Sequence, residues 1–361
     1  MAEPLKDRFL QLPFLEAFGA SISRVYPDWS QPKFLDHIYT TEWEAMELKE
    51  RMKQVSLAVG KCLPQDFGQA VEILKAASDG KQSFDGLVYA EFVLHHGQDN
   101  PDIALDALEV FTQLGSAEFA IRPFIMKYED LTMKRMRDWS KHKNVHVRRL
   151  ASEGCRPRLP WAPALPAFKK DPSPILPILE NLKDDPELYV RKSVANNLND
   201  LTKDNADLVL DLLERWNKDP SANTKWIIKQ ALRGLIKSGN ERALAILGYR
   251  EANAEIKNLS FPKSVTLGDK FKITFDLSNI GKSTTDLMID YIIYHQKANG
   301  KLTPKVFKLS NLKLEPGESK SLTKQHTIKP ITTRKYYPGE HQVAIQVNGK
   351  ILGQKSFELK I

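Results

Sequence analysis

The chain has 361 residues, 42% of them hydrophobic and 27% charged, with a formal net charge of +8, and this length allows two or more domains with separate cores. The balance is typical of a folded soluble protein, the N-terminus lacks the pattern of a secretion signal, and no apolar run approaches the roughly 18 residues of a transmembrane helix. Its two cysteines, Cys62 and Cys155, are far apart and no Cys/His cluster has metal-ligand spacing, so we expect a protein of the reducing cytoplasm with no disulfide, metal, cofactor or membrane association.

Helical patterns fill the first two thirds of the chain. Residues 4–20 carry apolar side chains at helical spacing, which predicts a first amphipathic helix, and a second is expected at about residues 30–39. Residues 41–60 begin with acidic residues and end at a glycine, the capping pattern of a longer helix. The pattern continues to about residue 250, so we expect an all-α domain at residues 1–250.

The second half of this helical region repeats itself. Residues 185–198 align without a gap on residues 219–232, and each copy contains a turn followed by a helix. When the segment that starts at His142 is aligned with residues 185–198 in the same way, Glu153 falls opposite Asn196. Helix pairs that repeat at roughly 34 to 47 residues are typical of a HEAT-like α-solenoid, in which each repeat buries its face against its neighbours and the inner helices line a concave wall.

Basic residues recur on the helices that would line this wall. Stacked rows of Lys and Arg can follow a phosphate backbone without reading bases, although each of them taken alone is equally well a solvated helix residue. Trp226 lies opposite Lys192 in the repeat alignment and either faces the same groove or packs between repeats. As a group, the aligned cations favour nucleic acid as the partner: Arg148, Arg149, Arg191, Lys192, Lys225, Lys229 and Arg233.

The most informative stretch is residues 142–166. Its helical part has one stripe of small or apolar residues, and the opposite stripe has one carboxylate, Glu153, among basic side chains that include Arg149 and Arg156. Prolines then recur at every third position, so the chain leaves the helix as a stiff extended segment that presents Trp161. Two simpler interpretations stay open: Glu153 forms an exposed ion pair with Arg149, or Trp161 is packed inside its loop.

After about residue 254 the pattern changes to short runs of period two, separated by GDK, NGK and PGE turns. About seven short strands in residues 255–361 are typical of an immunoglobulin-like sandwich, here without a disulfide because neither cysteine lies in it. The Asn348-Gly349 pair is the strongest hairpin signal of the chain. We therefore expect a multidomain protein, an all-α solenoid followed by an all-β sandwich.

The positive charge is concentrated in this C-terminal part. Residues 254–361 hold 18 Lys+Arg against 9 Asp+Glu, a net of +9, which leaves 35 of the 53 basic and 36 of the 45 acidic residues for the rest of the chain. Such asymmetry favours a polyanion or an acidic surface as partner, and a lysine-rich solvated exterior explains it about as well.

Three features of the chain resemble the AlkC group of bacterial alkylpurine DNA glycosylases: the run RRLASEGCRPRLPWAPALPAF at residues 148–168, the opening PLKDRF at residues 4–9, and the change of pattern near residue 254. The resemblance covers essentially the whole chain. It implies a HEAT-like domain that cradles duplex DNA and hydrolyses the N-glycosidic bond of cationic lesions, chiefly 3-methyladenine and 3-methylcytosine, in base excision repair. We expect a monomer of the bacterial cytoplasm, associated with the nucleoid through DNA, whose sandwich adds contacts to the DNA backbone.

The chemistry of that substrate class can be argued from the residues. N3-alkylation makes the base cationic, so the base leaves as a neutral molecule without a general acid, and water must then attack an oxocarbenium-like sugar. One ionised carboxylate beside the sugar serves both needs, because it stabilises the cation and orients the water. Glu153 suits this role, since Arg149 and Arg156 favour its ionised form. No catalytic lysine is evident, so we expect no β-lyase step.

The resemblance adds a second catalytic carboxylate, Glu118, through the context SAEFAIRP. AlkD relatives of the family have an aromatic residue one helical turn before the catalytic carboxylate, whereas this chain has Arg149, which suggests a guanidinium that contacts phosphate or a carboxylate. The alternative from another functional class is a non-enzymatic HEAT-repeat scaffold that binds DNA or a protein partner. The residues expected to bind substrate or DNA are Trp161, Arg149, Arg148, Arg156, Arg158, Lys192 and Trp226.

Overall fold

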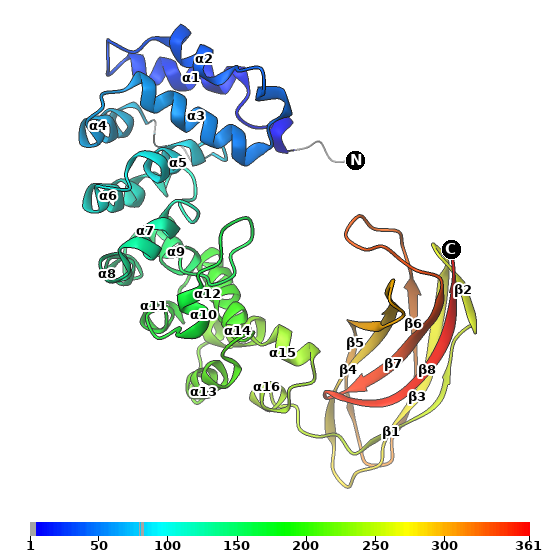
Figure 1. Cartoon of the computed structure of the whole chain (residues 1–361). Coiled ribbons are helices and arrows are strands. Elements are labelled where there is room, and N and C mark those ends of the chain that lie inside the picture. The colour runs from blue at the N-terminus through cyan, green and yellow to red at the C-terminus, as the bar shows by residue number, and fades with distance from the viewer. Residues whose placement is uncertain (1–4, 79, 81–82) are drawn as a thin grey trace. The chain divides into compact units, whose positions relative to one another are not determined.

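Helices and strands occupy separate parts of the computed structural model, which describes residues 5–78, 80 and 83–361. Helices come first and strands follow (Figure 1), which confirms the predicted HEAT-like solenoid and all-β sandwich. Of the helices described, none has the length and apolar character needed to cross a membrane. The helices are α1 (Leu12–Ser23), α2 (Gln31–Ile38), α3 (Leu48–Cys62), α4 (Phe67–Ala77), α5 (Leu87–His96), α6 (Pro101–Phe111), α7 (Ile121–Lys127), α8 (Glu129–Trp139), α9 (Val145–Glu153), α10 (Pro166–Lys170), α11 (Leu176–Leu182), α12 (Leu188–Leu201), α13 (Ala206–Trp216), α14 (Ala222–Ala231), α15 (Arg233–Lys237) and α16 (Glu241–Ile246).

The first predicted helix begins later than expected. Pro4, in the opening motif, lies outside the described residues, and a short 3-10 turn, η1 (Leu5–Asp7), precedes α1. Leu10 has a φ of 59°, which a continuous helix does not allow. Pro13 then lies in the first turn of α1, where its missing N–H costs no hydrogen bond.

The helix predicted at residues 41–60 is also shortened at its start. A 3-10 turn, η2 (Trp43–Ala45), comes first, and α3 begins after Glu47. Glu47 and Glu50 form a reciprocal capping box, which satisfies N–H groups that the first turn of a helix leaves free. The acidic start of this segment therefore belongs to the cap rather than to the helix.

The helices stack in two rows in the manner of HEAT repeats. α3 packs on α5, α9 on α12 and α12 on α14, while α4, α6, α8 and α11 form a second row beside this one (Figure 1). Each helix buries an apolar stripe, as Val147, Leu150 and Ala151 do in α9. Because each repeat covers the apolar face of its neighbour, the stack has a continuous core and the first row is free to line a surface.

Two sheets form the C-terminal part of the described chain. One has the strand order β1-β3-β6 and the other β2-β8-β7-β4-β5. Neighbouring strands are antiparallel, except β2 and β8, which are parallel. The strands are β1 (Ala254–Ser260), β2 (Ser264–Thr266), β3 (Lys270–Asn279), β4 (Thr285–Gln296), β5 (Leu302–Leu314), β6 (Ser319–Thr327), β7 (Gly339–Val347) and β8 (Lys350–Lys360).

Alternate residues of these strands build the core between the sheets. In β3 every second residue from Phe271 to Leu277 is buried, as period-two spacing predicts. The hairpin predicted at Asn348-Gly349 is confirmed, since β7 and β8 pair up to this turn and both of its residues have positive φ, 46° and 85°.

The chain divides into two compact units, and their boundary does not follow the change from helix to strand. One unit comprises the residues up to 231 without 210–217, and the other comprises 210–217 and 232–361. α15 and α16 therefore group with the strands. Asn348 Nδ2 donates to the Arg250 carbonyl at 2.8 Å, and a side chain on Gly349 would collide with Leu244 of α16. The expected boundary between residues 250 and 255 stays a prediction.

Candidate active site

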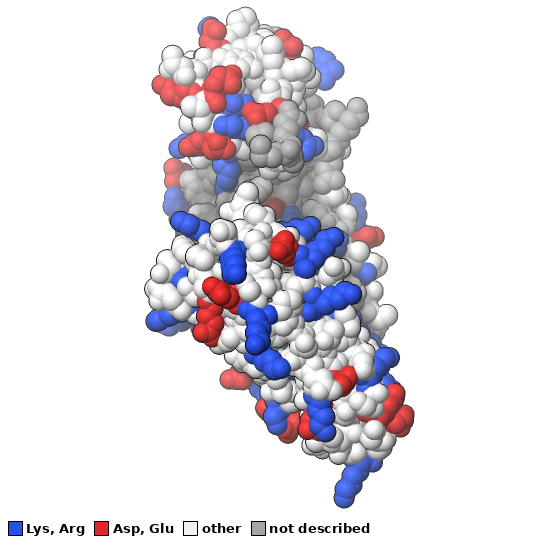
Figure 2. Space-filling model, turned by 90° about the vertical axis from the view of Figure 1, so that its right-hand side faces the viewer, with Lys and Arg blue, Asp and Glu red and all other residues white. Residues whose placement is uncertain are grey.

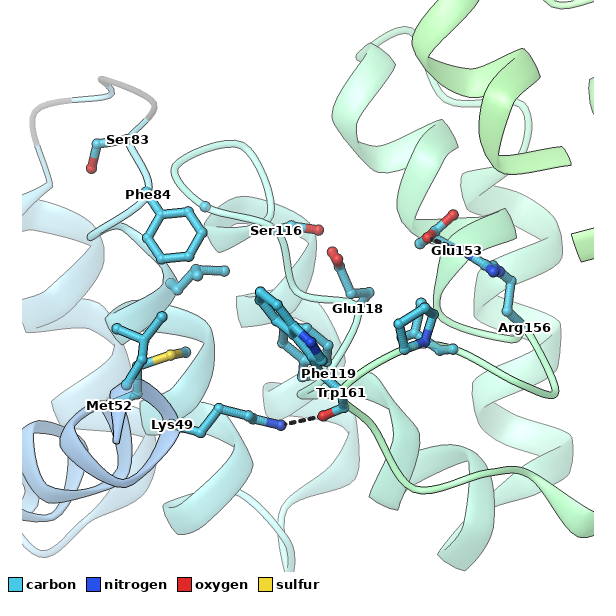
Figure 3. Close-up of a pocket in the computed structure, with 15 residues that line it drawn as sticks. Lys49, Met52, Ser83, Phe84, Ser116, Glu118, Phe119, Glu153, Arg156 and Trp161 are labelled. Carbon is cyan, nitrogen blue, oxygen red and sulfur yellow. Dashed lines mark hydrogen bonds and ion pairs between the residues drawn. The ribbon is translucent and has the colours of Figure 1, made fainter. Parts of the chain in front are cut away.

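A pocket of about 610 Å³ lies between α3, the segments that lead into α5 and α7, and the end of α9 with the loop after it. Apolar side chains such as Met52 and Phe84 form one part of its wall, and Glu118 and Glu153 lie in another part (Figure 3). A concave, largely apolar pocket with a few convergent polar groups is the usual form of a ligand site. The two carboxylates singled out from the sequence thus share one cavity.

Glu153 is the last residue of α9 and is only 5% exposed. The side chain of Asn144 caps the other end of this helix by accepting a hydrogen bond from the His146 N–H. Arg156 Nη1 lies 2.6 Å from Glu153 Oε1. The carboxylate is therefore buried and paired, and the simpler interpretation of an exposed ion pair with Arg149 is wrong.

Arg149 joins the two carboxylates. Its Nη1 donates to Glu118 Oε2 at 2.5 Å and its Nη2 lies 3.4 Å from Glu153 Oε1. Burial alone would lower the pKa of Arg149, but Glu118 and Glu153 outweigh burial and raise it, so the guanidinium keeps its charge. The ring of Tyr189 from α12 covers this guanidinium, with Cζ 5.0 Å from the ring centroid.

Arg156 extends the arrangement to a third carboxylate, Asp200 of α12. Its Nε donates to Asp200 Oδ2 at 3.0 Å while its Nη1 holds Glu153. Both side chains are buried, and burial would lower the pKa of Arg156, but Glu153 and Asp200 raise it. Carboxylates and guanidinium groups therefore alternate from Glu118 to Asp200, and each buried charge has a partner of opposite sign.

Trp161 lines the same pocket from the loop after α9. It is 65% exposed, which confirms that the loop presents the ring instead of burying it. Its φ of 64° lies in the left-handed region, which residues other than glycine seldom adopt. Lys49 of α3 donates to the Trp161 carbonyl at 2.7 Å, and its ammonium lies 4.5 Å from the centroid of the Phe119 ring (Figure 3).

Family models match both parts of the chain. The model described as DNA alkylation repair enzyme matches residues 115–235, and the model described as the C-terminal Ig-like domain of the uncharacterised protein YhaZ matches residues 255–361. A solved structure, the Pseudomonas fluorescens alkylpurine DNA glycosylase AlkC bound to DNA containing an abasic site analog, is 38% identical, with 99% of this chain and 100% of that chain covered and a TM-score of 0.92. The chain belongs to the AlkC family of alkylpurine DNA glycosylases.

A relative from another bacterium agrees with this membership. The uncharacterized protein YhaZ of Bacillus subtilis (strain 168) is 38% identical over 336 residues, which cover 92% of this chain and 93% of the relative. Membership of the AlkC family confirms the resemblance found in the sequence and assigns the protein to the repair of alkylated DNA.

Two arginines that the sequence predicted for DNA binding in this AlkC-family chain lie outside the pocket. Arg148 Nε lies 2.6 Å from Asp185 Oδ2, and this hydrogen bond raises the pKa of Arg148. Arg158 Nη2 lies 2.7 Å from Asp204 Oδ1. Both guanidinium groups already bind carboxylates, so a phosphate would have to share or replace those partners. Their contact with DNA stays a prediction.

Lys192 and Trp226 also lie away from the pocket. Lys192 is exposed on α12, while Trp226 of α14 is half-buried, with the Cζ atom of Arg191 5.9 Å from its ring centroid. The tryptophan thus bridges neighbouring repeats, which favours the inter-repeat alternative, and a role of either residue toward DNA is untested.

The sequence alone does not single out Asp200, Tyr189 or Lys49. For Asp200 a signal exists, because the repeat alignment sets Asn196 opposite Glu153 and Asp200 follows one helical turn later on the same face. Tyr189 and Lys49 reach the site from other repeats, and no spacing in the sequence connects them with it.

Metal-ligating side chains do not gather in residues 5–78, 80 and 83–361, where no group of three or more His, Cys, Asp or Glu could hold a metal ion. The two carboxylates of the pocket are each engaged by an arginine, Glu118 by Arg149 and Glu153 by Arg156. The pocket thus holds two arginine-bound carboxylates and an exposed aromatic ring, and both kinds of group can interact with an organic cation.

Proposed function

We propose that the protein is a monofunctional DNA glycosylase that releases N3-alkylated, cationic bases such as 3-methyladenine and 3-methylcytosine from duplex DNA. The observation that carries the proposal is the pair of carboxylates, Glu118 and Glu153, that Arg149 holds in one pocket. AlkC of Pseudomonas fluorescens, a glycosylase bound to DNA containing an abasic site analog, supports DNA as the substrate.

The charge of the leaving base determines which catalytic groups the protein needs. When the bond between the base nitrogen and C1′ of the sugar breaks, both bonding electrons go to the alkylated base, which leaves neutral. The sugar then carries the positive charge, and a water molecule adds to C1′ and loses a proton. A carboxylate beside C1′ stabilises this cation and accepts the proton, so a general acid is not required.

The contacts of the two carboxylates suggest different roles. Arg149 and Arg156 both approach Glu153 at Oε1, so these contacts leave Oε2 for a water molecule. Glu118 uses both of its oxygens toward Arg149. We therefore assign Glu153 as the general base that binds the water. Glu118 stabilises the sugar cation and holds Arg149 in place.

The remaining pocket residues fit a hydrolytic reaction. The exposed ring of Trp161 suits stacking on a base or covering a groove of the DNA. Lys49, the lysine that lines the pocket, donates to the Trp161 carbonyl and lies over Phe119, so we do not assign it as a nucleophile. A β-lyase step, which needs a free amine next to the sugar, is not part of the proposal.

Base release from duplexes that contain 3-methyladenine or 3-methylcytosine tests the assignment. Glu153→Gln keeps the shape of the side chain and removes its charge, so we expect a single-turnover rate lower by roughly 10²- to 10³-fold, and a smaller loss in Glu118→Gln. Glu72→Gln, at an exposed position of α4, is the matched control and should match the native protein. If Glu153→Gln releases the base at the native rate, Glu153 is not catalytic. If the native protein releases no base, the alternative of a non-enzymatic scaffold is favoured.

We further propose that residues 255–361 form an accessory domain that contacts the DNA backbone. The stretch from residue 254 to the end has 18 Lys+Arg against 9 Asp+Glu. Figure 2 shows Lys and Arg side chains spread over the near face of the sandwich, with fewer Asp and Glu among them. A surface of this kind attracts phosphates without reading sequence.

Replacing lysines on one sheet at a time tests this role. For each phosphate contact that is lost, binding to undamaged duplex should weaken and the slope of log K against log salt should decrease by about 1. If neither set of substitutions changes the affinity or the slope, the sandwich is not a DNA-binding element. The two sets of exposed lysines, changed to glutamine, are Lys257, Lys270 and Lys272 on β1 and β3, and Lys305, Lys308 and Lys313 on β5.

A further inference from the structure

Arg122, in α7, is a buried arginine that the proposed chemistry does not use. It is fully buried, and burial lowers the pKa of its guanidinium to about 10, so the group is still protonated at neutral pH. A charge in the interior is costly unless it is well hydrogen-bonded. The hydrogen bonds of this guanidinium go to backbone carbonyls.

Those carbonyls all belong to the loop between α9 and α10. Nε and Nη2 both donate to the Pro163 carbonyl, Nε at 2.9 Å. Nη1 donates to the Gly154 carbonyl at 3.0 Å and to the Arg156 carbonyl at 2.8 Å. One planar group therefore ties the start of the loop to its later part.

The bound carbonyls stand next to the residues to which we assign the reaction. Gly154 directly follows Glu153, and Arg156 carries the guanidinium that holds this carboxylate. Pro163 comes two residues after Trp161. Movement of any of these three backbone positions would displace the carboxylate or the exposed ring.

The later part of the loop, residues 160–164, has few constraints of its own. The Trp161 side chain is mostly exposed, so packing does not fix it, and its backbone adopts a left-handed φ that needs support from its surroundings. Within the loop, the N–H groups of Ala162 and Leu165 donate at 3.4 Å and 3.1 Å, and its prolines have no N–H to donate. Lys49 supports the loop from the pocket side, whereas Arg122 supports it from the core.

We propose that Arg122 is a positioning residue that fixes residues 154–163, so that Glu153, Arg156 and Trp161 keep one geometry around the substrate. This role rests on the function proposed above. A guanidinium has five donors in fixed directions and can bind carbonyls on two of its edges, whereas the ammonium of lysine has three donors at one point. Lysine at this position keeps the charge but cannot hold both ends of the loop.

The first test compares Arg122→Lys with Lys127→Met in the full chain. Lys127 is an exposed cation of the same helix that donates to Gln98 and Asp99, so its loss controls for a general effect on α7. In single-turnover release of 3-methyladenine, we expect Arg122→Lys to lower the rate at least about 10-fold while the Kd for DNA stays within about 3-fold. Lys127→Met should leave both at the native values, and a native rate in Arg122→Lys would overturn the proposal.

Amide exchange without DNA separates positioning from a general loss of structure. In Arg122→Lys the N–H groups of Ala162 and Leu165 should exchange faster, while those of α12 stay as in the native protein. In the background of Trp161→Ala the rate loss caused by Arg122→Lys should be smaller, because the two residues act through one loop. Unchanged exchange in the loop, or equal losses in both backgrounds, would overturn the proposal.

If Arg122→Lys does not fold, the proposal is tested in the native protein instead. Its Arg122 Nε proton should then exchange with solvent at least about 10-fold more slowly than the Nε proton of Arg158, which lies nearer the surface; equal rates would overturn the proposal. If the native protein releases no base while the loop exchange responds to Arg122→Lys, the catalytic function fails and the anchoring of the loop stands. Failure of the positioning role and failure of the proposed function are thus distinguishable.

Discussion

The pocket and the sandwich bury ionisable side chains in opposite ways. In the pocket, Glu153 and Arg156 are 5% and 7% exposed and lie 2.6 Å apart as a pair of ions. In the sandwich, burial lowers the pKa of His295 to about 3 and that of His326 to about 4, so both rings are neutral at pH 7. The protein keeps buried charge where the proposed chemistry acts on a cation, and excludes it from the core that holds two sheets together.

The neighbours of each group explain this difference. In the pocket, Arg149 and Arg156 each contact two carboxylates. In the sandwich, His295 faces the ring of His341 edge-on at 5.5 Å, and the Nδ1 atoms of both rings have no hydrogen-bond partner within the described chain. A proton on either ring would therefore create an unpaired charge in an apolar core.

Removing Arg156 should disturb the paired charges most strongly. In Arg156→Met, Glu153 loses its 2.6 Å partner, and Asp200 keeps Lys203 at 3.6 Å, whose side chain is 53% exposed. Because Glu153 then keeps only the longer, 3.4 Å contact with Arg149 and Asp200 keeps only an exposed lysine, two buried carboxylates are poorly compensated, and we expect the free energy of unfolding of the helical part to fall by about 3–5 kcal/mol. Urea unfolding followed by tryptophan fluorescence measures this loss, since all 6 tryptophans lie in residues 29–226.

Arg158→Met is the matched control on the same loop. The Arg158–Asp204 pair is 2.7 Å apart, but its side chains are 36% and 25% exposed, so water screens the charges. We expect this variant to change the free energy of unfolding far less than Arg156→Met does. Equal losses in the two variants would contradict the idea that burial sets the importance of these pairs.

Local patterns predict much of the fold and part of the site. The repeat of residues 185–198 indicates the stacked helix pairs, and Asn348-Gly349 indicates the hairpin that the structure contains. The helical stripe of α9 predicts a carboxylate among arginines, and the prolines after it predict an exposed Trp161. These features depend on neighbours within a few turns of chain, where spacing alone fixes which side chains meet.

The rest of the site depends on contacts between distant segments. Asp200 is 44 residues from Arg156, and Lys49 is 112 residues from Trp161. Such pairs form only because repeats stack at a particular angle, which periodicity does not encode. Glu118 illustrates the same limit, since only the resemblance to the AlkC family, and not its spacing from Glu153, pointed to it.

Lowering the pH should weaken the sandwich gradually. Histidine has an ordinary pKa of 6.5, which applies to the unfolded chain, whereas the folded values are about 3 for His295 and about 4 for His326. Between these values the unfolded chain binds protons that the folded sandwich does not, so stability is lost as the pH falls below about 6.5. Each histidine should contribute a slope of about 1.4 kcal/mol per pH unit.

His295→Phe isolates one of these contributions, because phenylalanine can keep the ring contacts with His341 and Tyr336 but cannot take up a proton. Urea midpoints of the sandwich, read by pulsed amide exchange of β4 and β7, should fall less steeply in this variant than in the native protein between about pH 7 and about pH 5.5. Tryptophan fluorescence reports the helical part in the same samples. Identical slopes in both proteins would mean that His295 does not resist protonation in the folded state, and the contrast between the charged pocket and the neutral core would fail at this residue.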